Sequence, residues 1–366
     1  MRGSFLARHD IQKKMREVRI RQMEEKLSFV SDYMEGAHPA ILKRLLETNL
    51  RKTEGYGFDA FSESARNKIR AACQSPEADV YFLTGGTQTN AIIIDSLLRP
   101  YQGVIASESG HISLHEAGAI EYGGHKVLVL PHTAGKISAD GIEKCINQYR
   151  NDANHEHMVM PGMVYLSQPT EYGTLYSLDE LKRISGVCHK YQISLYVDGA
   201  RLAYALACRE NDVTLPDLAA LCDIFYIGGT KCGALFGEAV FIPRHDYIPH
   251  LFTMIKQHGA LLAKGRIAGI QFDTLFTDGL YGRIGAPAIA AADIIRKALK
   301  EKGYQTAYGS PTNQIFVVLD KEKAAALSEK AELGFWENAD DSHVIMRIAT
   351  SWATRREEAE RLTAVL

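Results

Sequence analysis

The chain has 366 residues, of which 46% are hydrophobic and 23% charged, enough apolar material for a large core that we expect two domains to share. Its 42 lysines and arginines nearly balance 44 acidic residues, which argues against nucleic acid as a partner, and no apolar run approaches the roughly 20 residues that span a bilayer. Six scattered cysteines without CxxC spacing are typical of a reduced cytoplasmic protein, not of a disulfide framework or a zinc site.

The first 22 residues are rich in arginine and lysine and differ from the rest of the chain. We assign residues 1–28 to a basic lead-in and keep three interpretations open: a helical extension, an expression-vector remnant, or sequence upstream of a start at Met23. A transit peptide is a further alternative, although serine is sparse here. We expect this segment to take no part in the chemistry.

The next stretch predicts a helix, an aromatic loop and a second helix. An amphipathic pattern begins at about Pro39, and proline favours the first helical position. The loop Tyr56-Gly57-Phe58-Asp59 follows, and another helix then leads to Cys73.

A buried strand, VYFL, is followed by the tight turn Gly85-Gly86 and a helix that starts near Thr87. The free N–H groups and the dipole of a helix N-terminus suit a phosphate, and the Thr87 hydroxyl can donate to it. The stretch matches no nucleotide-binding motif, and an ordinary strand–turn–helix would have the same pattern.

A further strand–helix–strand unit, GVIASESGHISLHEAGAIEYGGHKVLVL, places His111 just past a strand, where a flat imidazole could stack on an aromatic cofactor. His111 and His115 are four residues apart and could share a helix face as metal ligands. Neither HExxH nor HxxEH is present, so we expect no metal site.

The strand MVYLSQ ends near Thr170, and Ser177 with Glu180 forms the pattern of a capping box before the next helix. The apolar runs ISLYVDGAR and DIFYIGGTKCG flank helix-compatible residues and predict a parallel pair of strands joined by a crossover. Asp198 and Lys231 stand at the carboxyl ends of these strands, where ligands bind in open α/β sheets.

The remaining stretch predicts an antiparallel strand, EAVFIP, and a long helical region over Tyr247–Phe276. The alanine-rich segment IGAPAIAAADIIRKALKEKG then forms a helix that bridges to a smaller domain with strands TNQIFVVL and VIMRIAT and a final helix. We predict an α/β fold with a mostly parallel central sheet and flanking helices, a large domain over residues 29–275 and a small C-terminal α/β domain over residues 276–366.

A carboxylate and a lysine that face one crevice are what pyridoxal phosphate (PLP) needs. The lysine forms a Schiff base with the aldehyde, and the aspartate keeps the pyridinium nitrogen protonated, so that the ring is an electron sink. Alone, Asp198 would be read as a helix cap and Lys231 as a surface lysine; together they favour a PLP enzyme.

Together these stretches resemble the low-specificity L-threonine aldolase family, in the β-eliminating lyase branch of the PLP-dependent fold type I (aspartate aminotransferase) enzymes. The resemblance runs from about Phe29 to the C-terminus, and its most specific part is DGARL followed by Lys231 about 33 residues after Asp198. It implies a PLP-dependent carbon–carbon lyase that cleaves L-threonine, L-allo-threonine or a related β-hydroxy-α-amino acid to glycine and an aldehyde.

The resemblance also assigns residues to three roles. Those implied to be catalytic are Lys231, His111 and Asp198. Those implied to bind the cofactor are Gly86, Thr87, His111, Asp198, Arg201, Thr230, Lys231 and Arg266. Those implied to bind the substrate, whose carboxylate an arginine fork can grip, are Ser31, Arg201, Arg347 and Thr170.

The chain departs from the family pattern at two places. The family has a histidine after the strand MVYLSQ, where this chain reads SQPTEYG and we place Thr170 at or near that histidine; Cys232 replaces a glycine. A threonine hydroxyl is too weak a base near neutral pH, so we expect His111 to abstract the substrate proton, with Glu171 as the nearest alternative.

The resemblance further implies a cytoplasmic homodimer or homotetramer in which Arg266, Lys256 and Tyr56 complete the active site of a neighbouring subunit. The nearest rival function is another PLP-dependent β-eliminating lyase that acts on an amino acid. A PLP-binding protein without activity, and a metal-dependent hydrolase built on His111 and His115, are more distant alternatives, because the first has no use for Arg347 and the second lacks ligands.

Overall fold

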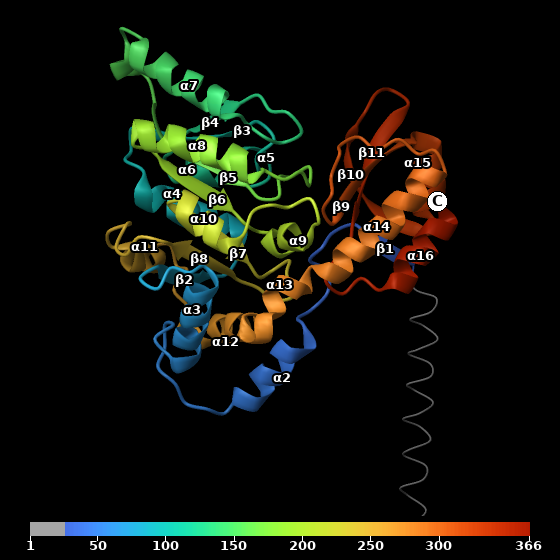
Figure 1. Cartoon of the computed structure of the whole chain (residues 1–366), viewed down its shortest axis with the longest axis horizontal. Helices are drawn as coiled ribbons and strands as arrows, with labels where there is room; N and C mark the ends of the chain where they lie inside the picture. The colour runs from blue at the N-terminus through green and yellow to red at the C-terminus, as the bar shows by residue number, and fades with distance from the viewer. Residues whose placement is uncertain (1–25) are drawn as a thin grey trace, which may run out of the picture.

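The structure is a computed structural model that describes residues 26–366, so the basic segment over residues 1–22 lies outside the described residues. The described chain forms one β-sheet of seven strands and one of four. Figure 1 shows the larger sheet with its helices on one side of the molecule and the smaller sheet on the other, and the long helix α14 (Ala286–Glu301) runs between them.

The larger sheet has the strand order β2-β8-β7-β6-β5-β3-β4. Its strands are β2 (Asp79–Leu83), β3 (Gln102–Ser107), β4 (Val127–Leu130), β5 (Met160–Ser167), β6 (Ser194–Asp198), β7 (Ile224–Gly228) and β8 (Glu238–Ile242). Strands β4, β3, β5, β6 and β7 run parallel, whereas β8 is antiparallel to both β7 and β2. The mostly parallel sheet and the antiparallel strand EAVFIP are thus confirmed.

The parallel pair that the sequence predicted is β6 and β7, with Tyr196 opposite Ile224. All residues of both strands are buried. Continuous β-branched and aromatic runs are typical of such strands, because helices cover both faces of a parallel sheet. The carboxyl ends of β6 and β7 therefore meet at one edge of the sheet.

The helices over residues 60–284 precede, connect or follow the strands of this sheet. They are α3 (Ala60–Ala72), α4 (Gly86–Leu97), α5 (His111–Leu114), α6 (Ala119–Tyr122), α7 (Ala139–Asn151), η1 (His155–His157), α8 (Leu178–Tyr191), α9 (Leu202–Ala207), α10 (Leu215–Leu221), α11 (Leu251–Gln257), α12 (Arg266–Leu275), η2 (Thr277–Gly279) and α13 (Leu280–Ile284). The capping box of Ser177 and Glu180 at α8 is confirmed. The long helical region expected over Tyr247–Phe276 is instead two helices, because the chain turns between α11 and α12 at Gly259, whose φ is +69°.

The smaller sheet has the strand order β1-β10-β11-β9. Its strands are β1 (Leu27–Phe29), β9 (Gln314–Asp320), β10 (Ala331–Asn338) and β11 (His343–Ala349), and its further helices are α15 (Lys321–Ser328) and α16 (Arg356–Val365). The sequence predicted β9, β11 and α16 but neither β10 nor α15. It also did not predict that β1 pairs parallel with β10 and so joins the first described residues to the C-terminal sheet.

Helix α14 packs against the cores of both sheets. Ala288 and Ile289 pack in the core of the larger sheet, whereas Ala292 and Ile295 pack in the core of the smaller one. This arrangement confirms the expected bridging helix. The domain limits at residues 28/29 and 275/276 stay predictions.

Helix α2 (Pro39–Thr48) begins at the proline that the sequence indicated and packs against α12. Figure 1 shows that α2 lies apart from both sheets. Within residues 26–366, no helix is both long and apolar enough to cross a membrane.

Candidate active site

Asp198 and Lys231 meet at the carboxyl ends of the parallel strands. Asp198 is the last residue of β6, Lys231 follows the end of β7 by three residues, and both line a cavity of about 120 Å³. A second cavity of about 430 Å³ adjoins it, because Lys231, Arg201, His111 and Glu171 line both. The structure thus places the carboxylate and the amine at one site, as the strand pattern indicated.

Asp198 is held as a carboxylate. The Tyr165 hydroxyl donates to Oδ2 at 2.6 Å and the Ala200 backbone N–H donates to Oδ1 at 3.0 Å. Burial alone would raise the pKa of Asp198, but the charge of His111 and the hydrogen bonds hold it below the usual value. An ionised, buried carboxylate is the partner that a pyridinium nitrogen requires.

The Lys231 amine is left available. Within the described residues, Nζ forms neither an ion pair nor a hydrogen bond, and it lies 5.9 Å from the centroid of the Tyr33 ring. The backbone, in contrast, is fixed, because the Tyr204 hydroxyl donates to the Lys231 carbonyl at 2.5 Å. An amine without a protein partner on an anchored backbone is suited to a covalent bond with an aldehyde.

The turn before α4 lines the inner cavity with Gly86 and Thr87. A Cβ atom at Gly86 would lie 3.0 Å from the Tyr226 hydroxyl, so glycine leaves room for a ligand to approach the backbone. Thr230 behaves differently: its hydroxyl donates to Glu238 at 2.7 Å and accepts from the Gly237 N–H. The Thr230 hydroxyl therefore already has two partners within the protein, and its role at the cofactor stays a prediction.

His111 lines both cavities, and its imidazole Nδ1 lies 2.7 Å from Oε1 of Glu116. Glu116 in turn accepts from the Asn90 amide, which also donates to Asp198. The sequence analysis missed both Glu116 and Asn90. Their only signal was position, since Asn90 lies three residues after Thr87 and Glu116 lies five residues after His111.

Two guanidinium groups border the outer cavity. Arg201 is paired bidentately with the buried Asp32, at 2.6 Å and 3.0 Å. Arg347 has no carboxylate partner among the described residues: it donates to the Val30 carbonyl at 2.9 Å, and its Nε is buried without a hydrogen bond. Burial and the charge of Arg201 lower the pKa of Arg347, so an anion beside it would be stabilised.

Ser31 lies in sequence between Val30 and Asp32, the contacts of the two arginines. Its hydroxyl is buried without a hydrogen-bond partner in the structure. Ser31 lines a different cavity, of about 390 Å³, whereas Arg201 and Arg347 line the outer one, so its implied role at the substrate stays a prediction. The sequence analysis missed Asp32, although it follows Ser31 directly.

The loop after β5 brings Glu171, not Thr170, to the cavities. The Thr170 hydroxyl lies 2.7 Å from that of Thr174 and lines neither cavity. Oε1 of Glu171 accepts from the Ser167 hydroxyl at 2.6 Å and from the His111 backbone N–H at 2.9 Å. Burial, and to a lesser degree the charge of Asp198, raise the pKa of Glu171, because the hydrogen bond from Ser167 offsets only part of the cost. Thr170, which the sequence placed at the substrate, therefore lies outside both cavities, whereas Glu171 lines both.

Arg266 lies outside both cavities of its own chain. Its guanidinium donates to the backbone carbonyls of Thr48 and Arg51 and lies over the ring of Phe61. Lys256 lies over the ring of Tyr56 at 4.9 Å, and the Tyr56 N–H donates to the Ala263 carbonyl, so both belong to the same region as α12. A role for these residues at a cofactor requires a second subunit.

The donor set at the inner cavity fits PLP. An ionised buried carboxylate, a free amine, an imidazole and a glycine-containing helix N-terminus surround it. Among residues 26–366, no group of three or more histidine, cysteine, aspartate or glutamate side chains has the geometry of a metal site. His111 and His115 have ring centroids 5.7 Å apart, and Nδ1 of His111 is bound to Glu116.

Comparison with known proteins gives a consistent set of relatives. The model of the beta-eliminating lyase family matches residues 28–339. The low specificity L-threonine aldolases of Pseudomonas sp. and Pseudomonas aeruginosa are 28% and 29% identical, over 84% and 82% of this chain and 88% and 86% of theirs. The structure of Leishmania major threonine aldolase is similar with a TM-score of 0.89 and 43% identity, covering 93% of this chain and 98% of that one. Thermus thermophilus aspartate aminotransferase, at 14% identity and a TM-score of 0.67, shares the fold.

Proposed function

We propose that this chain, which belongs to the beta-eliminating lyase family, is a PLP-dependent aldolase. It cleaves threonine or a related β-hydroxy-α-amino acid to glycine and an aldehyde. The observation that carries the proposal is the meeting of Asp198, Lys231 and a guanidinium without a carboxylate partner at one pair of adjoining cavities. The similarity to the threonine aldolases of Pseudomonas and Leishmania supports the same activity.

PLP bound here supplies an electron sink for the electrons of the substrate bond that breaks. The protein's part is to hold the cofactor and to align that bond. With PLP bound, Asp198 would pair with the pyridinium nitrogen, Lys231 would supply the amine for covalent attachment, and Gly86 and Thr87 would hold the phosphate at the N-terminus of α4.

Arg347 binds the substrate carboxylate, and Arg201 adds its charge beside it. Asp32 pairs with Arg201, and Arg347 has no carboxylate partner among the described residues, so Arg347 contributes a positive charge that the substrate carboxylate would neutralise. Holding the carboxylate fixes the rotation of the substrate about its amino group. This contact would orient the Cα–Cβ bond for cleavage, and bound PLP would take up its electrons.

His111 accepts the proton of the substrate hydroxyl, directly or through one water molecule. It lines both cavities, and imidazole is the side chain best suited to proton transfer near neutral pH. Glu171 is the alternative acceptor, since it lines the same two cavities and its raised pKa brings it nearer to the working range of a general base.

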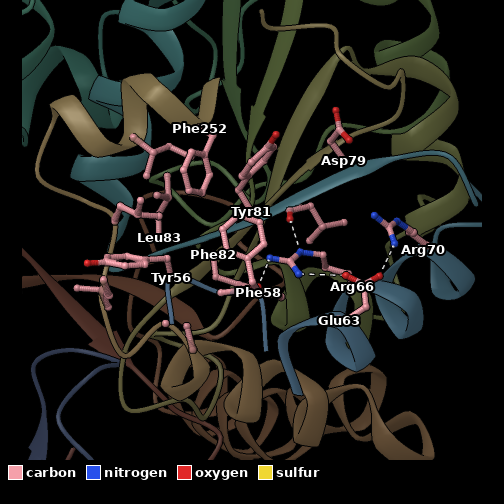
Figure 2. A pocket seen from close by; sticks show the side chains of 17 residues that line it. Tyr56, Phe58, Glu63, Arg66, Arg70, Asp79, Tyr81, Phe82, Leu83 and Phe252 are labelled. Carbon is pink, nitrogen blue, oxygen red and sulfur yellow. Dashed lines mark hydrogen bonds and ion pairs between the residues drawn. The ribbon is translucent and has the colours of Figure 1, made fainter. Parts of the chain in front are cut away.

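The active enzyme is a homo-oligomer. Leucines at positions 42, 46 and 50 on α2 and its end are 49%, 78% and 93% exposed, an apolar stripe that a single chain leaves in water. Figure 2 shows a further cavity, of about 430 Å³, with Tyr56, Phe58 and Phe252 on one side and charged residues on the other. These surfaces adjoin Arg266 and Lys256, the residues expected to reach a neighbouring active site. Six free cysteines suit the reducing cytoplasm in which we place the enzyme.

The test uses purified PLP-loaded protein and glycine in D₂O. An aldolase exchanges one α-hydrogen of glycine for deuterium, because glycine is its product and its Cα proton is removed in the reverse reaction. NMR should show the loss of this proton signal, faster by orders of magnitude than with Lys231→Ala. An unchanged glycine signal would contradict the proposal.

A further inference from the structure

A buried chain of hydrogen bonds joins the two groups that would face the cofactor. Asn90 donates from Nδ2 to Oδ2 of Asp198 at 3.2 Å and to Oε1 of Glu116 at 2.7 Å. The same Glu116 oxygen lies 2.7 Å from Nδ1 of His111. Both Asn90 and the Glu116 side chain have no exposed surface. A fully buried carboxylate is tolerated only when it is paired, so Glu116 is not a filler of the core.

The orientation of Asn90 is fixed by its neighbours. The Tyr196 hydroxyl donates to Oδ1 at 2.8 Å, and the opposite side of the amide faces two carboxylates, which need a donor. Oε1 of Glu116 therefore already accepts one amide proton. Nδ1 of His111, at 2.7 Å, is the second group on this oxygen, and Oε2 of Glu116 is buried with no partner among the described residues that could accept a proton from it.

The distance between Glu116 and His111 requires a proton between them, because two lone pairs would repel at 2.7 Å. With Glu116 ionised, this proton lies on Nδ1. Nε2 forms no hydrogen bond with residues 26–366, and about a third of the imidazole is exposed, in a ring that lines both cavities. The unprotonated nitrogen is then the one on the cavity side of the ring.

We propose that Glu116 is a positioning residue that holds the Nδ1 proton of His111 and leaves Nε2 as the proton acceptor in the cavity. Asn90 ties this pair to Asp198, so that the ring and the cofactor partner keep one arrangement. The inference rests on the proposed function and deepens it, because it names the residue that makes His111 a base. The arrangement has the logic of a buried carboxylate that fixes the tautomer of a catalytic histidine.

The direct test is NMR of the PLP-loaded protein with ¹⁵N-labelled histidine and without substrate, at about pH 8.5, well above the ordinary pKa of histidine. Correlations between ring protons and ring nitrogens show which nitrogen carries the proton. The chain contains two internal references: Nδ1 of His155 faces the Asp152 carbonyl and must be protonated, whereas Nδ1 of His38 accepts from the Ala40 N–H and must be bare. The signal absent from His111→Phe identifies His111.

We expect His111 to show the pattern of His155, with the proton on Nδ1. The pattern of His38 would overturn the proposal, because Glu116 would then be the protonated partner. The result does not depend on turnover, and it needs no variant of Glu116 to fold.

The second readout is kinetic. Glu116→Gln keeps the size of the side chain but removes its charge, so the Nδ1 proton is held less strongly and the positive charge that His111 gains as a base is no longer balanced. We expect kcat to fall by roughly 10²–10⁴, the range of general-base catalysis, with KM and PLP affinity unchanged. The matched control is Glu180→Gln, which removes a carboxylate paired with Lys136 outside both cavities and should leave kcat unchanged.

An unchanged kcat in Glu116→Gln, or a loss explained entirely by lower PLP occupancy, would overturn the proposal. The two levels of inference are separable in the same set of measurements. If wild-type protein forms no glycine and aldehyde although His111 carries its proton on Nδ1, the proposed function fails and the assignment of Glu116 stands. If the products form but the proton lies on Nε2, the assignment of Glu116 alone fails.

Discussion

At the residue scale, Arg347 separates substrate binding from cofactor binding. It borders the outer cavity but not the inner one that holds Asp198 and Gly86. Arg347→Ala should weaken glycine and threonine binding by about 2–5 kcal/mol, the cost of truncating one partner of a charged contact, and leave PLP affinity unchanged. Titrating the visible spectrum of the loaded enzyme with glycine measures the first, and PLP release measures the second.

The control for Arg347→Ala is Arg356→Ala, which removes a guanidinium paired with Glu360 on the surface of α16. The control should behave as wild type in both titrations. A glycine midpoint that is the same in Arg347→Ala and wild type would remove Arg347 from the substrate site.

A second residue-scale prediction decides between the two candidate bases. His111→Phe keeps a flat ring for stacking but has no nitrogen, so PLP should bind normally while single-turnover aldehyde release falls by roughly 10²–10⁴. Glu171→Gln is the paired variant, and it should retain most of the rate. The opposite result, a near-normal rate of aldehyde release in His111→Phe and a low rate in Glu171→Gln, would identify Glu171 as the base.

The sequence predicted which reactive side chains lie at the edge of the sheet, but not the buried residues that contact them. Asp198, Lys231, His111 and Gly86 follow strands or turns directly, so their placement at the sheet edge could be predicted from local pattern. Asn90 and Glu116 act through contacts across 26 residues of sequence, which no local periodicity records. Thr170, which the sequence placed at the substrate, lines neither cavity for a related reason: the direction of a side chain in an irregular loop depends on partners such as Thr174.

At the element scale, β8 supports the turn that carries Lys231. Glu238, the first residue of β8, accepts from the Thr230 hydroxyl and from the Gly229 N–H. Burial raises the pKa of Glu238 from 4.5 to about 7, with the hydrogen bonds offsetting only part of this effect. The folded state therefore favours the protonated acid.

A pH dependence of stability follows from this shift. A raised folded-state pKa stabilises the fold fully below the unfolded value of 4.5, and this contribution is lost as the pH rises through about 7. Between pH 5 and pH 8 the unfolding free energy of wild type should fall, relative to Glu238→Gln, by on the order of 3 kcal/mol. Urea unfolding of both proteins at the two pH values measures this, and a difference that is independent of pH would contradict it.

Elements with strong local signals could be predicted, and those defined by distant partners could not. The parallel strands β5 to β7, the capped helix α8 and the proline-started α2 all have such signals in their own residues. Strand β10 contains two glutamates and a glycine, does not alternate regularly between buried and exposed, and is defined by its pairing with β1 and β11. The break between α11 and α12 depends on a left-handed glycine in an otherwise helix-compatible run.

At the scale of the whole molecule, the exposed leucines of α2 should be covered by a second chain. Replacing Leu46 and Leu50, the two most exposed, with glutamate should convert the oligomer to monomers, because each subunit would bury a charge at the interface. Light scattering gives the mass, and circular dichroism gives the fold. The control is Tyr122→Glu, another almost fully exposed apolar residue, at the end of α6. A wild-type protein that is monomeric and fully active would refute the shared active site.

The central claim is that the chain breaks the Cα–Cβ bond of a β-hydroxy-α-amino acid. The measurement that tests it most directly is product analysis by NMR after PLP-loaded wild-type protein is incubated with L-threonine, with Lys231→Ala as the control. Our account predicts equal amounts of glycine and acetaldehyde from wild type and neither from the variant. Formation of 2-oxobutanoate and ammonia without glycine would show elimination and contradict the account.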